Sequence, residues 1–338
     1  MARMGDFGVV DYTSLFALAP RKIDQLAALG IFSEAQTDYI DGRYAEFERE
    51  ELGHTAMYNV SRDAERQFMG SEQARKEILE VPFATLDGVT KSNEVENFRA
   101  YGTDQQNLTV EQVVTKKVAH IQRSHSAYET SVAYTALINN RVHAVTATGA
   151  QITGLAKDFS TVWGAARKTA AINVGDDTVN PFTELLVQRA AIIAEVGDQA
   201  APSGFIYLCN STQFNAIVGH PLVEDAYNKY ASEQEPLRRA LRAGEFDAQV
   251  FSHKGITLVE DLSGKIANTA GFLLPVGIED MFKKVYAPAN TLEHVNTISQ
   301  GSYLFMKEEW RTAIMESELA VMCMITRPEL ICDVTATL

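Results

Sequence analysis

His125 and Glu129 form the pair of residues whose types and spacing come nearest to a metal-binding group in this sequence. They stand four residues apart in a stretch with helical periodicity, so both side chains would lie on one face, one turn apart. Imidazole and carboxylate groups are both ligands of zinc. His120 falls about 140° away around the helix axis and does not complete a set on that face. Packing or hydrogen bonding is therefore the preferred interpretation, and a metal-dependent soluble oligomeric enzyme is the minor alternative.

Other motifs that carry chemistry are missing from the sequence. Gly149 and Gly154 have the glycine spacing of a phosphate-binding loop, but Leu155 and Ala156 follow where that loop needs lysine and a hydroxyl residue. Neither GxGxxG nor GxSxG occurs. Carboxylates are abundant, yet no pair is marked by its surroundings as a general acid and base. We therefore predict a protein that is not an enzyme, with no catalytic residue, no metal site and no cofactor.

The composition is that of an acidic globular protein. The 338 residues carry a formal net charge of −14, which disfavours binding to DNA phosphates or to an anionic membrane. No apolar run approaches the ~18 residues of a membrane span, and charged residues interrupt the N-terminus, so no signal peptide is expected. The three cysteines lack CxxC spacing, which favours buried thiols in a reducing compartment.

The element that would carry His125 is a long amphipathic helix over residues 108–140. Apolar residues recur there at intervals of three and four, and neither proline nor glycine interrupts the stretch. At about 1.5 Å per residue such a helix would be on the order of 45 Å long, well beyond the ~3 turns of an average helix. A helix of this length is typical of a spine against which other elements pack.

A long charged segment lies between predicted strands in the first third of the chain. Residues 44–50 alternate between inward and outward positions of a strand, and residues 55–60 are a second strand candidate. Residues 61–77 are highly charged, and a further strand pattern follows at 78–86. Strands joined by a long solvated segment suggest a projecting hairpin whose partner lies outside the protomer. A surface loop without a partner is the alternative.

The remaining patterns suggest a compact α/β lobe and a buried C-terminal sheet. Asn180 and Pro181 begin a helix over 182–196, which Gly197 ends. Other predicted elements are a short helix at 22–31, a hairpin at 141–159, strand 205–209, a helix through 218, a helical stretch 222–230, hairpin strands 246–251 and 256–260, and strands 272–275, 313–325 and 330–334. Strand 313–325 is apolar on both faces in its C-terminal half, so we expect it deep in a sheet. Its methionines, Trp163 and Trp310 are predicted to be packing residues.

A spine helix, an N-terminal arm, a projecting hairpin and a compact lobe suit a subunit that contacts copies of itself. From about Gly204 onward the chain also resembles the major capsid proteins of tailed phages, in the family of the lambda head protein. The resembling segments are Tyr207-Leu208-Cys209-Asn210-Ser211 with Phe214 and Gly219-His220-Pro221-Leu222-Val223, then Phe272-Leu273-Leu274-Pro275, then Tyr286-Ala287-Pro288-Ala289-Asn290 with Glu293 and Val295-Asn296-Thr297, and the strand pair around Pro328. Four segments in the same order are more specific than any one alone.

The resemblance implies an α+β, Hong Kong 97-like tailed-phage major capsid fold. In that mapping, residues 1–43 are an N-terminal arm, 44–203 a peripheral domain, 204–296 an axial domain, and 297–338 a return to the peripheral sheet with C-terminal strands. The peripheral domain would contain an extended loop at about 51–82 and the spine helix at about 108–140. One departure is Asp261-Leu262-Ser263-Gly264, which stands where the family commonly has an arginine-glycine turn.

The resemblance also implies a function. Such a major capsid protein self-assembles into hexamers and pentamers that form an icosahedral head shell around double-stranded phage DNA. Its implied partners are other copies, a portal, a scaffold protein and, as a further candidate, a decoration protein, with DNA as non-specific content and no membrane partner. The expected location is the virion capsid, assembled as a procapsid in the host bacterial cytoplasm. A bacterial protein compartment of the same fold is the alternative.

The candidate intersubunit contacts are the charged and aromatic residues of the loop. These residues are Arg62, Glu65, Arg66, Phe68, Glu72, Arg75, Lys76 and Glu77. Ion pairs of this kind are individually weak, but they would recur at every copy. The acidic balance further predicts a shell interior poor in basic charge, along which DNA would slide.

Overall fold

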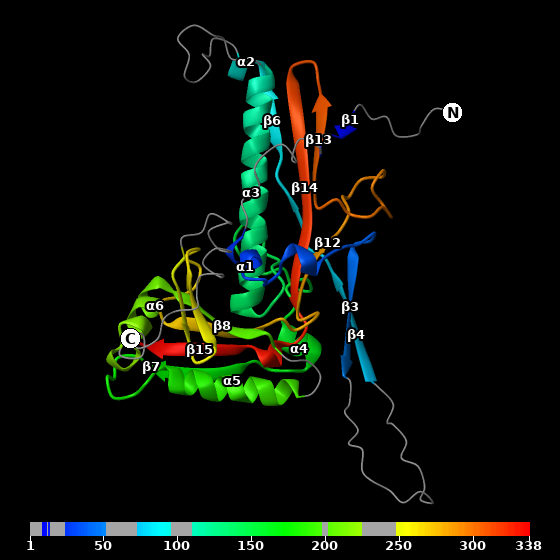
Figure 1. Ribbon diagram of the computed structural model, residues 1–338. Helices are drawn as coiled ribbons and strands as arrows, with labels where there is room; N and C mark the ends of the chain where they lie inside the picture. The colour runs from blue at the N-terminus through cyan, green and yellow to red at the C-terminus, as the bar shows by residue number, and fades with distance from the viewer. Residues whose placement is uncertain are drawn as a thin grey trace, which may run out of the picture. The chain divides into compact units, whose positions relative to one another are not determined.

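The computed structural model describes residues 9–11, 13, 24–51, 73–95, 110–197, 202–224 and 248–338 (Figure 1). The chain divides into two compact units. Unit 1 contains Met1–Ala45, Glu80–Lys157 and Lys283–Met324, and unit 2 contains Glu46–Leu79, Asp158–Phe282 and Ile325–Leu338. Each unit therefore combines segments that lie far apart in the sequence.

Unit 1 is built from the long helix α3 (Val110–Asn139) and a sheet. Among the described residues this sheet has seven strands, in the order β1-β13-β14-β12-β2, with β5 and β6 also paired to β14. The strands are β1 (Val9–Asp11), β2 (Thr37–Tyr39), β5 (Phe83–Thr85), β6 (Gly88–Lys91), β12 (Phe282–Tyr286), β13 (Ser302–Glu308) and β14 (Thr312–Ile325). Shorter elements are α1 (Gln25–Ala28), η2 (Glu34–Gln36) and α2 (Ser92–Val95). Figure 1 shows α3 running alongside β6 and β14.

The apolar face of α3 forms part of the core of unit 1. Val118 and Ile121 pack with Leu304 of β13 and Met315 of β14, and all four are buried. The helix ends at Asn139, and Asn140 follows with a φ of 54°, a left-handed conformation that asparagine tolerates at helix ends. The predicted spine helix is thus confirmed within the described residues.

The strand β14 is buried on both faces in its C-terminal half. Every residue from Leu319 to Ile325 is buried, as the sequence pattern predicted. Met315, Met322 and Met324 have no exposed surface, which confirms their packing role. β14 pairs antiparallel with β13, β5 and β6, and it is also the neighbour of β12 in the sheet. Such a strand contributes to the core with both sets of side chains.

Unit 2 contains a mixed sheet whose described strands follow the order β7-β15-β11-β8-β10-β9. The strands are β7 (Lys168–Asn173), β8 (Gly204–Asn210), β9 (Val250–His253), β10 (Ile256–Asp261), β11 (Ala270–Val276) and β15 (Cys332–Thr337). The helical elements are α4 (Phe159–Trp163), α5 (Phe182–Val196), α6 (Ser211–Val218) and η3 (Pro328–Leu330). The unit also includes most of a two-stranded ribbon, β3 (Tyr44–Glu51) and β4 (Gln73–Glu80).

The centre of the unit 2 sheet is β8. It pairs parallel with β10 and antiparallel with β11. The hydroxyl of Tyr207 on β8 accepts a hydrogen bond of 2.5 Å from Gln213 Nε2 of α6. A Cβ at Gly271 of β11 would lie 2.1 Å from that hydroxyl oxygen, so only glycine fits opposite the buried tyrosine. The predicted strand 205–209 and the following helix are confirmed, with Asn210 as the cap.

The boundaries around the charged segment need correction. The strand predicted over 78–86 is two strands, β4 and β5, with Val81 and Pro82 between them. β4 already begins at Gln73, inside the segment predicted as a loop over 61–77. The strand predicted at 55–60 lies outside the described residues. The charged residues at the start of β4 are held in the strand by pairing with β3 rather than by apolar burial.

Three other predictions are also corrected in detail. The hairpin predicted over 141–159 is present without regular strands. Val145 pairs antiparallel with Gln151, Thr146 N donates to Ala150 O at 2.8 Å, and Ile152 N donates to Ala144 O at 3.0 Å, before α4 begins. The helix predicted over 22–31 is only α1, and the last strand begins at Cys332 rather than at residue 330. No helix among the described residues is long and apolar enough to cross a membrane.

Candidate assembly site

The ribbon formed by β3 and β4 carries three of the predicted intersubunit residues. Ala45 and Phe47 of β3 and Leu79 of β4 are buried, while Glu46 and Lys76 are exposed. This alternation follows the two-residue repeat of a strand. In the described part of the chain the two strands pair only with each other. A two-stranded ribbon is marginally stable alone, so its position depends on side-chain contacts with the rest of unit 2.

Arg49 attaches β3 to the turn η3. Its Nη2 lies 2.7 Å from Glu329 Oε1, and its Nη1 lies 3.4 Å from Glu329 Oε2. Nη1 also donates to the backbone oxygen of Thr326 at 3.5 Å. The Arg49 and Glu329 side chains are only 15% and 14% exposed. Because this bidentate pair has little competition from water, it holds the ribbon more firmly than a surface ion pair would.

Arg75 attaches β4 to the C-terminal end of α4. Its Nη1 donates to the carbonyl oxygen of Trp163 at 2.8 Å, and its Nη2 donates to that of Val162. Helix C-termini leave carbonyl groups without intrahelical partners and attract cations. Gly164 ends α4 with a φ of 67°, and a Cβ there would lie 3.2 Å from Arg75 Nη1. Glycine therefore both ends the helix and admits the guanidinium group.

The outer face of the ribbon carries exposed charges. Lys76 Nζ lies 2.5 Å from Glu46 Oε2 and 3.6 Å from Glu48 Oε1. The hydrogen bond with Glu46 is the main cause that raises the pKa of Lys76 above its usual value. Exposed pairs of this kind contribute little to the stability of a protomer. Their charges are accessible to another chain.

The structure locates only some of the eight predicted contact residues. Arg62, Glu65, Arg66, Phe68 and Glu72 lie outside the described residues. Arg75, Lys76 and Glu77 lie on β4 and have partners within the protomer, and their role between subunits stays a prediction. Sequence reasoning missed Arg49, although a signal was present. Arg49 occupies the inward face of the alternating strand, where a charged side chain needs a partner.

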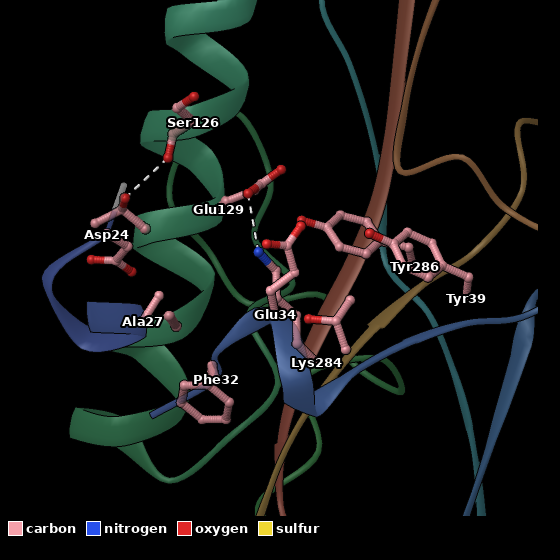
Figure 2. Close-up of a pocket in the computed structure, with 12 residues that line it drawn as sticks. Asp24, Ala27, Phe32, Glu34, Tyr39, Ser126, Glu129, Lys284 and Tyr286 are labelled. Atoms are coloured by element: carbon pink, nitrogen blue, oxygen red, sulfur yellow. Dashed lines mark hydrogen bonds and ion pairs between the residues drawn. The ribbon is translucent and has the colours of Figure 1, made fainter. Parts of the chain in front are cut away.

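A pocket in unit 1 contains a second ion pair (Figure 2). Lys284 Nζ of β12 lies 3.0 Å from Glu129 Oε2 of α3. The same nitrogen lies 4.9 Å from the centre of the Tyr286 ring, on which Tyr39 stacks at 5.4 Å. Burial lowers the pKa of Lys284, but the charge of Glu129 raises it and the net shift is upward. The arrangement is that of a structural ion pair joining α3 to β12.

His125, which was considered with Glu129 as a metal ligand only in the minor alternative, has a different partner. Its Nε2 lies 3.0 Å from Ser317 Oγ of β14, and burial lowers the pKa of the imidazole. Glu129 is engaged with Lys284. Within the described ranges, no group of three or more His, Cys, Asp or Glu side chains is placed to hold a metal ion. Hydrogen bonding and ion pairing account for both residues.

The prediction for Trp310 is wrong. Trp163 is buried as expected, but Trp310 is 96% exposed at the turn between β13 and β14. Leu292, Val295 and Ile298, in the segment between β12 and β13, are exposed as well. Charged residues flank Trp310 on both sides in the sequence, and this is the signal for an exposed position. These apolar residues are further candidates for contact with another chain.

Two solved structures with this architecture come from a prophage and a cyanophage. The crystal structure of a protein from a prophage of Escherichia coli CFT073, assigned as its capsid protein, matches with a TM-score of 0.59 and 9% identity, over 97% of this chain and 99% of that chain. The capsid of cyanophage A-1(L) matches with a TM-score of 0.53 and 14% identity, over 94% of this chain and 96% of that chain. These likenesses establish the fold: the chain has the tailed-phage capsid fold, as the resemblance predicted.

Sequence comparison defines the family. The family described as phage major capsid protein E matches residues 10–336. The major capsid protein of Pseudomonas phage KPP10 is 28% identical over 323 residues, which cover 89% of this chain and 88% of that protein. The chain belongs to the phage major capsid protein E family. It is therefore a viral structural protein of the capsid shell, and the predicted family is confirmed.

Proposed function

We propose that this chain is the building block of an icosahedral phage head, in which hexamers and pentamers enclose double-stranded DNA. The family match over residues 10–336 carries this proposal. The ribbon supports it as well, because Arg49 and Arg75 attach it to η3 and α4 while its outer face keeps exposed charges. Anchored projections of this kind suit contacts with neighbouring copies.

The proposal also assigns each part of the chain to a domain of the capsid fold. Residues 1–43 would be the N-terminal arm, 44–203 the peripheral domain with the loop at about 51–82, 204–296 the axial domain, and 297–338 the return to the peripheral sheet. The long helix α3 supports a peripheral spine, and the strands β8, β9, β10 and β11, which lie within 204–296, support an axial domain. The same sheet also contains β7 and β15, which lie outside that range. The loop residues from Arg62 to Glu77 would pair with charges on an adjacent copy.

Further partners follow from this function. A portal, a scaffold protein and a decoration protein are proposed partners, with assembly in the host cytoplasm before the protein is located in the virion. DNA would be enclosed without specific recognition. The net charge of −14 supports this, because an acidic shell does not hold phosphate groups by attraction. A strongly positive inner face in an assembled shell would contradict this part of the proposal.

The first test is assembly of the intact chain. The protein would be expressed alone and with its neighbouring phage genes, then studied by size-exclusion chromatography and negative-stain electron microscopy. Closed shells, or rings and tubes of capsomers, are the expected result. A small discrete oligomer under every condition would contradict the proposal.

The second test removes the loop but keeps the ribbon. Deletion of residues 61–72 leaves β4, which begins at Gln73, intact. The variant is expected to fold as a protomer and fail to close shells. A control in which the same residues are replaced by a glycine-serine segment of equal length separates the effect of the side chains from that of loop length. Normal shells from the deletion variant would show that the loop is dispensable.

A further inference from the structure

The hairpin between β13 and β14 presents a tryptophan at its tip. Glu309 N donates to Thr312 O at 2.8 Å and Thr312 N donates to Glu309 O at 3.3 Å, so Trp310 and Arg311 are the two central residues of a tight turn. Neither central residue has a positive φ, so the backbone of this turn accepts most residue types and does not require an indole. Trp310 is nevertheless 96% exposed. Exposing an apolar side chain of this size in a rigid turn points to a partner surface.

The charges around Trp310 favour a protein partner over a polyanion. Lys307 Nζ lies 3.2 Å from Glu309 Oε1, and Arg311 adds one positive charge beside the indole. The tip therefore carries both signs in a chain whose net charge is −14. A nucleic acid backbone would require a basic surface. A surface of mixed charge with one aromatic anchor is typical of contacts between proteins.

The same unit carries an apolar surface of a different kind. Leu292, Val295 and Ile298 are spaced three residues apart between β12 and β13 and are 83%, 54% and 71% exposed. The segment is attached to β13 and β14 by two contacts. The backbone N of Asn290 donates to Glu318 Oε2 at 2.8 Å, and the ring of His294 packs edge-on against Tyr303 at 5.0 Å. These contacts fix the backbone of the segment, and its three exposed apolar residues are here called the 292–298 patch.

We propose that Trp310 of one copy docks on the 292–298 patch of a second copy. The inference rests on the proposed function, because a shell places many copies of this chain side by side. Within one copy the indole is almost fully exposed, so it does not reach its own patch. Figure 1 shows the β13–β14 hairpin at one end of the unit 1 sheet and the β12–β13 segment at its side. A contact between two different surfaces is heterologous, and repeated contacts of this type form a ring when the rotation between copies closes, as it does in a capsomer.

The tryptophans provide a direct probe of this contact. The chain has two, and Trp163 is 4% exposed while Trp310 is 96% exposed. In free protomers the emission of Trp310 should be red-shifted and readily quenched by acrylamide. In shells the emission should shift to the blue and quenching should fall, because a buried indole loses about 150–250 Å² of exposed surface. The variant Trp310→Phe supplies the background from Trp163.

A cross-linking experiment tests the proposed pairing. The native cysteines Cys209, Cys323 and Cys332 are buried, and burial raises their pKa values, so introduced cysteines would be the reactive thiols. The double variant Arg311→Cys with Ile298→Cys keeps the indole and should form disulfides between copies in shells. The control Arg311→Cys with Val187→Cys places the second thiol at an exposed apolar site of α5 and should not.

Substitution of the anchor should weaken assembly without unfolding the protomer. Trp310→Ala should raise the protein concentration needed for shells by roughly tenfold or more, with unchanged thermal unfolding of the protomer. Wild-type shells in which Trp310 is quenched as in free protomers would overturn the inference, and so would Trp310 burial without cross-linking to residue 298. If the wild-type chain forms no shells at all, the proposed function fails instead.

Discussion

The sheet and the ribbon of unit 2 are stabilised in different ways. Leu208, Val259 and Leu273 lie in the middle of the sheet with no exposed surface, on strands that have neighbours on both sides. The ribbon has one pairing partner per strand and charged residues along its outer face. The sheet therefore forms a core within the protomer. The ribbon depends on Arg49 and Arg75 and, in the proposed shell, on a neighbouring copy.

The sheet and the ribbon of unit 2 should differ most in how much free energy of unfolding is lost when an apolar side chain is shortened. Leu208→Ala in β8 is expected to lower the free energy of unfolding by about 2–5 kcal/mol, because it leaves a cavity in a closed core. Ile78→Ala in β4 is the matched control, since that side chain is exposed and should change the free energy of unfolding by less than about 0.5 kcal/mol. Urea unfolding followed by circular dichroism measures both. Equal losses would show that the ribbon has an apolar core of its own.

The second prediction concerns the ribbon's anchor. Arg49→Ala should destabilise unit 2 by about 1.5–3 kcal/mol, because Glu329 keeps its buried position but loses its charged hydrogen-bond donor. The same urea experiment measures the change, and electron microscopy should show fewer closed shells.

Arg43→Ala is the control for this anchor. Arg43 pairs with Glu80 on the surface and its side chain is 68% exposed, so no measurable loss of stability is expected. Equal effects of the two substitutions would mean that the ribbon is not held through Arg49.

The same contrast explains which parts of the fold could be predicted from the sequence. The helix α5 was predicted to the residue, because Asn180 accepts a hydrogen bond from Phe182 N at its start and Gly197 stops it. The strands β8 and β11 of the unit 2 sheet appear as apolar runs, since the side chains on both of their faces are buried. Local signals of this kind need no knowledge of distant residues.

The parts that were missed depend on distant partners. The first residues of β4 have no apolar periodicity, and they are ordered by Arg75 with α4 and by Lys76 with β3. The partner of Arg49 is Glu329, which lies at the other end of the chain. The exposure of Trp310 follows from a tight turn whose proposed partner is another copy. A sequence pattern can mark such a residue as unusual, but it does not show which distant residue is its partner.

A third prediction concerns the pH dependence of stability and a partly buried ion pair of the unit 2 sheet. Arg167 Nη1 lies 3.0 Å from Asp333 Oδ1 of β15. Burial raises the pKa of Asp333 and Arg167 lowers it, with a net upward shift. In Arg167→Ala only burial acts on the pKa of Asp333, and burial raises it. The free energy of unfolding of this variant should be about 1 kcal/mol lower than that of the wild type at neutral pH. The loss is small because the Asp333 side chain is 39% exposed.

The sign of the pH dependence follows from the raised pKa of Asp333. A carboxyl group whose pKa is higher in the folded than in the unfolded state opposes folding when it is ionised. This cost begins to fall as the pH drops through the folded pKa and is gone below the unfolded pKa. The stability gap between Arg167→Ala and wild type should therefore shrink below neutral pH. Urea titrations at several pH values measure it. A gap that widens on acidification would contradict the assignment to Asp333.

The smallest effect on the protomer is expected at Lys76. Its pairs with Glu46 and Glu48 are exposed, so Lys76→Ala should leave the unfolding transition unchanged. If the outer face of the ribbon also contacts a neighbouring copy, the same substitution should raise the concentration needed for shells and reduce the sensitivity of assembly to salt, because salt screens exposed charges. Light scattering at several salt concentrations measures both. Unchanged assembly would show that Lys76 makes contacts only within its own protomer. The contacts between copies would then involve other residues of the loop.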